Sequence, residues 1–125
     1  MSAERRVNRP LLALAGLCGA AGVALAAAGC HGGAPDLGIA GNFLLFHAPA
    51  LIGIALLPDN RLAKAGGYLL IAGLVLFAGD LVTLATRGVS PLPLAAPIGG
   101  SLLILGWLIL ALSALVSGHP GKHGD

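Results

Sequence analysis

Asp80 is the residue whose type and position most require a chemical explanation. It stands inside the stretch from Ala65 to Thr86, which has no other charged residue. A carboxylate at the centre of a membrane helix costs about 2.5 to 3.5 kcal/mol even on the lenient insertion scale. His47 lies in a second apolar stretch at a similar expected depth, so the two side chains could meet. Thr83 follows Asp80 by three residues, shares its helix face and could hydrogen-bond it.

His31, at the end of the first apolar stretch, could approach the same place. The candidate intramembrane polar cluster therefore consists of His31, His47, Asp80 and Thr83. In a structural interpretation, these groups satisfy each other or the backbone, and the aspartate is protonated. In a functional one, they form a proton relay, a metal site or an ion path. We favour the structural interpretation, because one aspartate and one well-placed histidine are few ionisable groups for a transporter.

Other reactive residues predict no catalytic, cofactor or metal site. Cys18 and Cys30 are separated by twelve residues of predicted helix, about 18 Å at 1.5 Å per residue, which is beyond disulfide reach. Cys30 beside His31 supplies two ligands, fewer than a closed metal site needs. His119 and His123 lie in a short Gly-rich end. No serine or cysteine has an evident base, and no phosphate-binding glycine loop follows a strand, so we expect no enzyme.

Composition places these residues in a membrane protein. Of the 125 residues, 57% are hydrophobic and 10% are charged, and the mean hydropathy is +0.93. A soluble domain carries about 25% charge. The net charge is only +2, and the basic residues lie at chain ends and turns, so nucleic-acid binding is excluded. The lipid bilayer is the expected solvent.

Gaps between charges predict four membrane-spanning helices in one domain covering residues 1–125. A helix needs roughly 20 apolar residues to cross the hydrocarbon core. Trimming the apolar stretches at turn-forming residues places the spans near 10–29, 42–58, 66–86 and 96–117, with 118–125 as a short flexible tail. The longest connection is about a dozen residues, so sequential helices should pack as an all-α, up-down antiparallel bundle.

The positions of Lys and Arg predict the orientation, because cytoplasmic loops retain positive charge. One side of the predicted bundle carries six of the seven basic residues, and Arg87 lies opposite. The six are Arg5, Arg6, Arg9, Arg61, Lys64 and Lys122. Both termini are therefore expected in the cytoplasm, with the protein in the inner (cytoplasmic) membrane.

The N-terminal segment allows an alternative. Basic residues, an apolar stretch and Ala27-Ala28-Gly29-Cys30 resemble a bacterial lipoprotein signal, whose cleavage before Cys30 would remove the first span. Against this, Ala27 stands where such signals usually have Leu, and the apolar run of about 20 residues exceeds the usual 7 to 15. We expect the first span to be retained.

Small residues predict where helices pack closely. Pairs four residues apart recur in the first span, and such pairs let two membrane helices approach. The fourth span opens with Pro97-Ile98-Gly99-Gly100. The predicted packing residues are Gly16, Gly19, Ala20, Gly22, Ala26, Gly99 and Gly100.

Several short motifs together resemble the membrane-protein family catalogued as domain of unknown function 423, which includes eukaryotic transmembrane protein 256. Cys30-His31-Gly32 resembles the family's Ala-His-Gly, and Phe46-His47-Ala48-Pro49-Ala50 resembles its Tyr-His-Ala-Leu-Ala. The remaining motifs are Gly67-Tyr68, Leu76-Phe77-Ala78-Gly79-Asp80 and Pro97-Ile98-Gly99-Gly100 with Gly106-Trp107. Together these motifs span most of the chain, and their order and spacing make the resemblance specific. The resemblance implies a four-helix membrane protein and supplies no activity, substrate or cofactor.

This chain departs from the family pattern at informative places. Asp80 stands where the family has Ser, and Pro49 where it has Leu. The segment from His31 to His47 also looks shortened. The hypothesis we favour is a small accessory or scaffold subunit that packs against a larger membrane complex or a second copy of itself. The alternative is a small transporter or proton- or metal-handling protein that uses His31, His47 and Asp80.

Overall fold

The computed structural model describes residues 6–32 and 34–116, and this part of the chain is all α-helical. Its four helices are α1 (Arg9–Gly32), α2 (Pro35–Leu56), α3 (Arg61–Arg87) and α4 (Ala95–Val116). Each is long and apolar enough to cross a membrane. The prediction of four helices that are candidate membrane spans is therefore confirmed. Position 117, the tail 118–125 and the two histidines within it lie outside the described residues.

The connection between α1 and α2 differs from the prediction. α2 begins at Pro35, seven residues before the expected start, and only residues 33–34 separate it from α1. The backbone N–H at the first helical position has no partner inside the helix, so proline, which lacks this N–H, costs no hydrogen bond there. Its fixed φ also suits the helix. The dipeptide Pro35-Asp36 thus starts a helix, and the prediction of a connection of about a dozen residues there was wrong.

α3 also begins earlier than predicted, at Arg61 instead of 66. The side chain of Asn60 caps it by accepting a hydrogen bond from the Ala63 amide at 3.1 Å, as helix N-terminal asparagines commonly do. The helix ends at Arg87 and is capped by Gly88, whose φ of 74° is in the left-handed region. Glycine adopts this conformation without steric cost. α3 is consequently the longest helix, at 27 residues.

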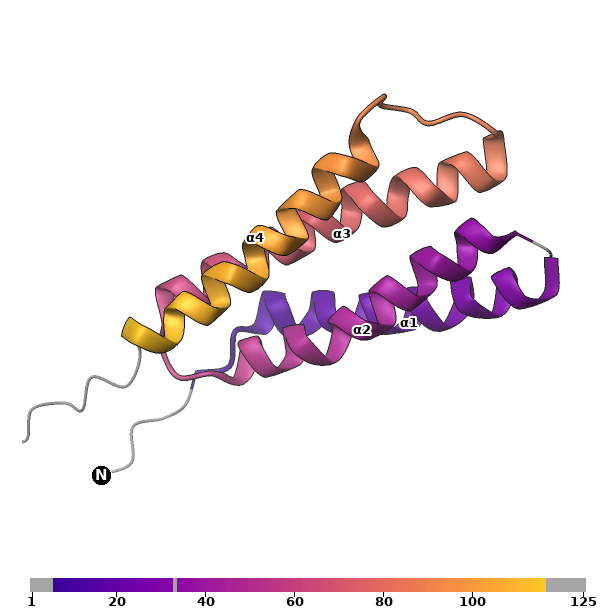
Figure 1. The fold of residues 1–125 in the computed structure, drawn as a ribbon. Helices are drawn as coiled ribbons and strands as arrows, with labels where there is room; N and C mark the ends of the chain where they lie inside the picture. Colours follow the sequence, from indigo (N-terminus) through magenta and orange to yellow (C-terminus); the bar gives the residue numbers. More distant parts are fainter. Residues whose placement is uncertain (1–5, 33, 117–125) are drawn as a thin grey trace, which may run out of the picture.

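The helices form two antiparallel hairpins, α1–α2 and α3–α4 (Figure 1). The connections inside the hairpins lie at one end of the molecule, and the link from α2 to α3 lies at the other. α2 packs against α3 and joins the hairpins, whereas α1 touches α3 only locally. In the described residues, α1 does not pack against α4. The bundle therefore consists of two hairpins that pack together chiefly through α2 and α3.

Backbone contact between glycines holds the first hairpin together. A Cβ atom added at Gly41 would lie 2.5 Å from the Ala26 amide nitrogen, and one at Gly22 would lie 3.0 Å from the Gly41 carbonyl oxygen. Further along, a Cβ at Gly29 would meet the Gly38 nitrogen at 2.5 Å. Such close approach maximises dispersion contact, which together with interhelical hydrogen bonds replaces the hydrophobic effect as the cause of helix association in lipid.

Close backbone contacts at glycines also hold the second hairpin together. A Cβ at Gly99 would lie 2.6 Å from the Phe77 amide nitrogen and 2.8 Å from the Gly73 carbonyl oxygen. A Cβ at Gly106 would lie 3.0 Å from the Gly66 carbonyl oxygen. Between the hairpins, large side chains fill the α2–α3 interface. The largest fully buried ones on these two helices are Leu51, Ile54, Leu70 and Leu74, and Leu11 of α1 is also fully buried.

The residues predicted to pack divide into two groups. Gly22, Ala26 and Gly99 make the close backbone approaches just described, and a Cβ at Gly19 would make an ordinary 3.7 Å contact. Gly16 and Ala20 lie on the exposed face of α1, with nothing within 4 Å of a Cβ at Gly16. A Cβ at Gly100 would likewise meet open space. The glycines of α2 and α3 that complete these contacts were not predicted.

Candidate functional site

His47 is buried in α2, where it is 7% exposed, and both of its ring nitrogens have partners. Nδ1 lies 2.7 Å from the Phe43 carbonyl oxygen, and Nε2 lies 3.1 Å from Nε1 of Trp107 on α4. Tryptophan can only donate and a carbonyl can only accept. Nε2 therefore accepts and Nδ1 carries the proton, which fixes a neutral imidazole with no nitrogen free for a metal or for Asp80.

An aromatic cluster surrounds this histidine and connects three helices. The Phe43 ring on α2 lies 4.3 Å from the Phe77 ring on α3, and the His47 and Trp107 rings lie 5.7 Å apart. These rings line a groove of about 630 Å³ between α2 and α4, which Pro97 and other α4 residues complete. We call it the α2–α4 groove. Its polar groups are few and already hydrogen-bonded, so it can accept an apolar or flat ligand more readily than an ion.

Asp80 lies elsewhere. It is 7% exposed, and its Oδ1 atom is buried with no hydrogen-bond partner among residues 6–32 and 34–116. It stands one helical turn beyond Phe77, whose backbone packs against Gly99 of α4. Because α3 and α4 are antiparallel, Asp80 is level with the first turn of α4, near Ala95. Negative charge is favoured at a helix N-terminus, although none of the described residues donates a hydrogen bond to Oδ1 there.

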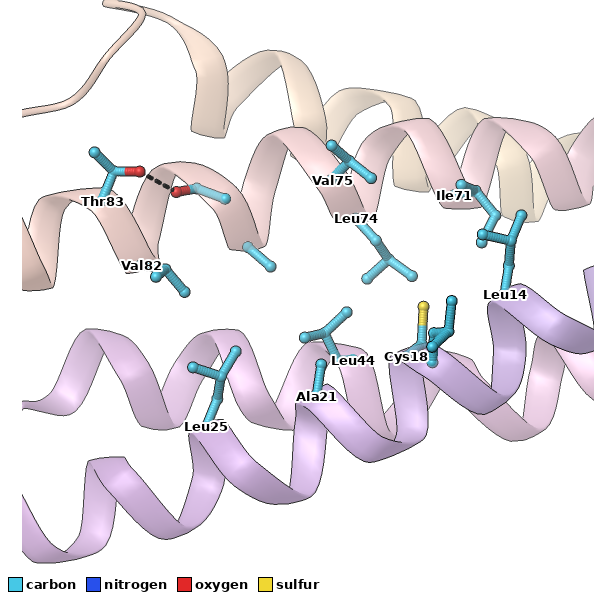
Figure 2. Close-up of a pocket in the computed structure, with 13 residues that line it drawn as sticks. Leu14, Cys18, Ala21, Leu25, Leu44, Ile71, Leu74, Val75, Val82 and Thr83 are labelled. Atoms are coloured by element: carbon cyan, nitrogen blue, oxygen red, sulfur yellow. Dashed lines mark hydrogen bonds between the residues drawn. The ribbon is translucent and has the colours of Figure 1, made fainter.

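Thr83 does not hydrogen-bond Asp80. Its hydroxyl donates to the Gly79 carbonyl oxygen of its own helix at 2.8 Å, as Figure 2 shows. Thr83 lines a second groove, of about 480 Å³, between α1 and α3. The other walls of this α1–α3 groove are mostly aliphatic and include Leu14, Leu25 and Val82, with the thiol of Cys18 beside them (Figure 2). Neither groove contains Asp80.

The remaining sequence candidates are at or near the surface of α1. His31 is exposed at the end of the helix, with Nδ1 2.8 Å from the Ala27 carbonyl oxygen. Cys30 is exposed and Cys18 is half-buried beside the α1–α3 groove, and both thiols are free. Within residues 6–32 and 34–116, no three His, Cys, Asp or Glu side chains gather as metal ligands would.

The structure thus separates the four candidates of the polar cluster. His47 bonds to Trp107, Thr83 to its own helix, and His31 to α1, while Asp80 is buried alone. Sequence reasoning missed Trp107 as the partner of His47. The motifs that carry the family resemblance contain both residues, but nothing in their spacing indicates that they meet.

Four apolar helices, glycine-mediated hairpins and an aromatic cluster around a buried histidine define a multi-pass helical membrane protein. The chain belongs to the family described as "Protein of unknown function (DUF423)", whose pattern it matches over residues 25–100. The resemblance stated from the motifs is confirmed. The match ends before Trp107, so the second half of α4 lies beyond it.

Curated relatives with similar sequences are bacterial membrane proteins. A UPF0382 membrane protein of Haemophilus influenzae is 33% identical over 78 residues, which are 61% of this chain and 63% of the relative. UPF0382 membrane protein YwdK of Bacillus subtilis is 33% identical over 79 residues, 59% of this chain and 63% of the relative. The chain therefore spans just under two thirds of the length of these relatives. No solved structure matches the chain.

Proposed function

We propose that this protein is a non-enzymatic accessory subunit of the bacterial inner (cytoplasmic) membrane that packs against another integral membrane protein. The observation that carries the proposal is the outward face of α1. This face is made of small residues and has no partner within the described chain. Its members are Ala13, Gly16, Ala20, Ala24 and Ala27, all exposed.

These residues lie on the side of α1 opposite the one that packs against α2. At 100° per residue, Ala20 lies about 160° around α1 from Gly22, which packs against α2. α1 therefore carries small residues on two opposite sides. One side packs against α2, and the other faces outward. A helix of another protein could approach this outward face closely, because its five members carry no side chain larger than a methyl group. The exposed side chains of Leu17 and Val23 flank the face and would contact the sides of such a helix.

The proposed orientation has both termini in the cytoplasm. Arg9, Arg61 and Lys64 lie near the end of the molecule at which α1 begins and α2 connects to α3. Arg87 lies at the opposite end, at the close of α3. This asymmetry agrees with the preference of cytoplasmic loops for Lys and Arg. A C-terminal reporter that is active only outside the cytoplasm would contradict the orientation.

Purification in a mild detergent, followed by mass spectrometry, tests the subunit role. We expect a second membrane protein to copurify with the wild-type chain and to be lost from Ala20→Leu, whose larger side chain prevents close helix approach. Ala111→Leu is the matched control, because Ala111 is exposed on α4, away from α1. Recovery of the wild-type chain without any other protein contradicts the proposal.

The second candidate is a small transporter or proton- or metal-handling protein. Asp80 favours it, because a buried carboxyl oxygen without a partner can take up a proton or a cation. His47 gives it no support, since both of its nitrogens are engaged. Wild-type and Asp80→Asn proteins in vesicles with a pH-sensitive dye distinguish the candidates. Proton flux that Asp80→Asn abolishes would favour transport over the subunit role.

A further inference from the structure

Asn42 exposes a primary amide within the apolar part of α2. It lies five residues after Leu37, where the uncharged stretch begins, or about 7.5 Å along the helix. Its side chain is exposed and has no hydrogen-bond partner within residues 6–32 and 34–116. An amide without a partner is costly in hydrocarbon, because lipid tails offer no hydrogen bond. The asparagine side chain is also too short to extend to the headgroups, as lysine or arginine can.

The rest of this face of α2 is apolar. Asn42, Phe46, Pro49 and Gly53 are all exposed and follow one another at intervals of four, three and four residues. Phe46 is 72% exposed, and a Cβ at Gly53 would meet nothing within 4 Å. This spacing is that of a coiled-coil seam. We call these four residues the Asn42 face.

The Asn42 face points away from the partners of α2 inside the molecule. Gly41, on another side of the helix, contacts α1, and His47, on a third side, reaches Trp107 of α4. A helix from outside could therefore lie along the Asn42 face without displacing either hairpin contact.

We propose that the Asn42 face binds the same face of a second copy of this chain, in a parallel two-fold dimer. A primary amide has donors and an acceptor, so two asparagines facing each other can exchange hydrogen bonds reciprocally. A two-fold axis along the membrane normal places both copies of Asn42 at the same depth, as this exchange requires. A single asparagine in an otherwise apolar seam fixes register and oligomeric state in coiled coils.

The chemistry favours a copy over other occupants. The Asn42 face carries no charge, so it does not call for a charged partner, and its polar group is its own complement. The dimer uses α2, whereas the accessory-subunit role uses the outward face of α1. Each copy in the dimer would keep its α1 face available, so the two proposals can fail independently.

The test uses the purified full chain in phosphatidylcholine vesicles, with dimerisation measured by energy transfer between labelled copies over a range of protein-to-lipid ratios. We expect Asn42→Leu to weaken dimerisation roughly tenfold, because one interhelical amide pair is lost. Asn42→Gln, which keeps the amide, should retain most of the affinity. Ser101→Ala is the matched control, because it removes an exposed polar group that bonds only to the Pro97 carbonyl of its own helix. Its dimerisation should be unchanged.

Cysteine cross-linking locates the interface. In a background carrying Cys18→Ala and Cys30→Ala, Gly53→Cys should form an intermolecular disulfide, whereas Ala111→Cys on α4 should not. This arm keeps Asn42 and so decides the matter even if Asn42→Leu fails to fold. The proposal is overturned if the wild-type chain is monomeric at every density, if Asn42→Leu dimerises normally, or if Ala20→Cys on α1 cross-links in place of Gly53→Cys. Ala20→Leu, the variant expected to lose the copurifying protein, should still dimerise like the wild-type chain.

Discussion

Trp107 and His47 lie 60 residues apart in the sequence and are joined by a hydrogen bond of 3.1 Å from the indole Nε1 to the imidazole Nε2. The bond connects α4 to α2, two helices whose backbones do not pack against each other in the described chain. Each hairpin is held internally by glycine contacts, and the large side chains of α2 and α3 hold the hairpins together. The Trp107–His47 bond adds a second link at the side of that interface.

Replacing Trp107 by Phe should destabilise the bundle. The ring is largely kept, but the imidazole Nε2 loses its donor in an apolar groove. The free energy of unfolding should fall by about 0.5 to 1.5 kcal/mol, measured by denaturant titration in mixed micelles. Tyr68→Phe is the control, because the Tyr68 hydroxyl makes a long, exposed bond of 3.5 Å to Asn8 and should contribute almost nothing. Equal stability of Trp107→Phe and wild type would show that the bond is unimportant.

Adjacent glycines at the start of α4 should respond oppositely to alanine. A Cβ at Gly99 would lie 2.6 Å from the Phe77 backbone nitrogen, whereas one at Gly100 meets nothing within 4 Å. Gly99→Ala must therefore push α4 from α3, and overpacking of this kind costs about 1 to 3 kcal/mol. Gly100→Ala should be neutral or stabilising by up to about 1 kcal/mol, from helix propensity. Thermal unfolding in detergent compares the two, and a similar loss in both would contradict the packing described.

The first hairpin offers the same comparison three residues apart on α2. A Cβ at Gly41 would lie 2.5 Å from the Ala26 backbone nitrogen, whereas one at Gly38 has open space. Gly41→Ala should separate α1 from α2 and lower the free energy of unfolding by about 1 to 3 kcal/mol. Gly38→Ala should not. Protease sensitivity of the link between α1 and α2 gives a second readout, which should rise only for Gly41→Ala.

Hydropathy was sufficient to predict the four helices, because each must be a long apolar segment to cross lipid. The start of α2 was missed because Pro35 serves equally in a turn and at the first position of a helix. The contacts of Gly41 and Gly73 were missed for a different reason. Which small residues meet depends on the register of one helix against another, and that register is a tertiary property. The Trp107–His47 bond is tertiary in the same sense.

Asp80 leads to the last prediction, because its Oδ1 atom is buried without a partner. If the described residues are the only surroundings of Asp80, a charged carboxylate there is desolvated without compensation. The nearly isosteric Asp80→Asn carries no charge and should then raise the free energy of unfolding by about 1 to 3 kcal/mol. Ser113→Ala provides the contrast. The Ser113 hydroxyl is also buried but donates to the Leu110 carbonyl oxygen at 2.6 Å, so its removal should be neutral or destabilising. Denaturant titration in mixed micelles measures both variants. A loss of stability in Asp80→Asn would mean that the carboxylate has a partner beyond the described residues, for example an ion or a group on another protein. Repeating the titration with the copurified complex would distinguish these two.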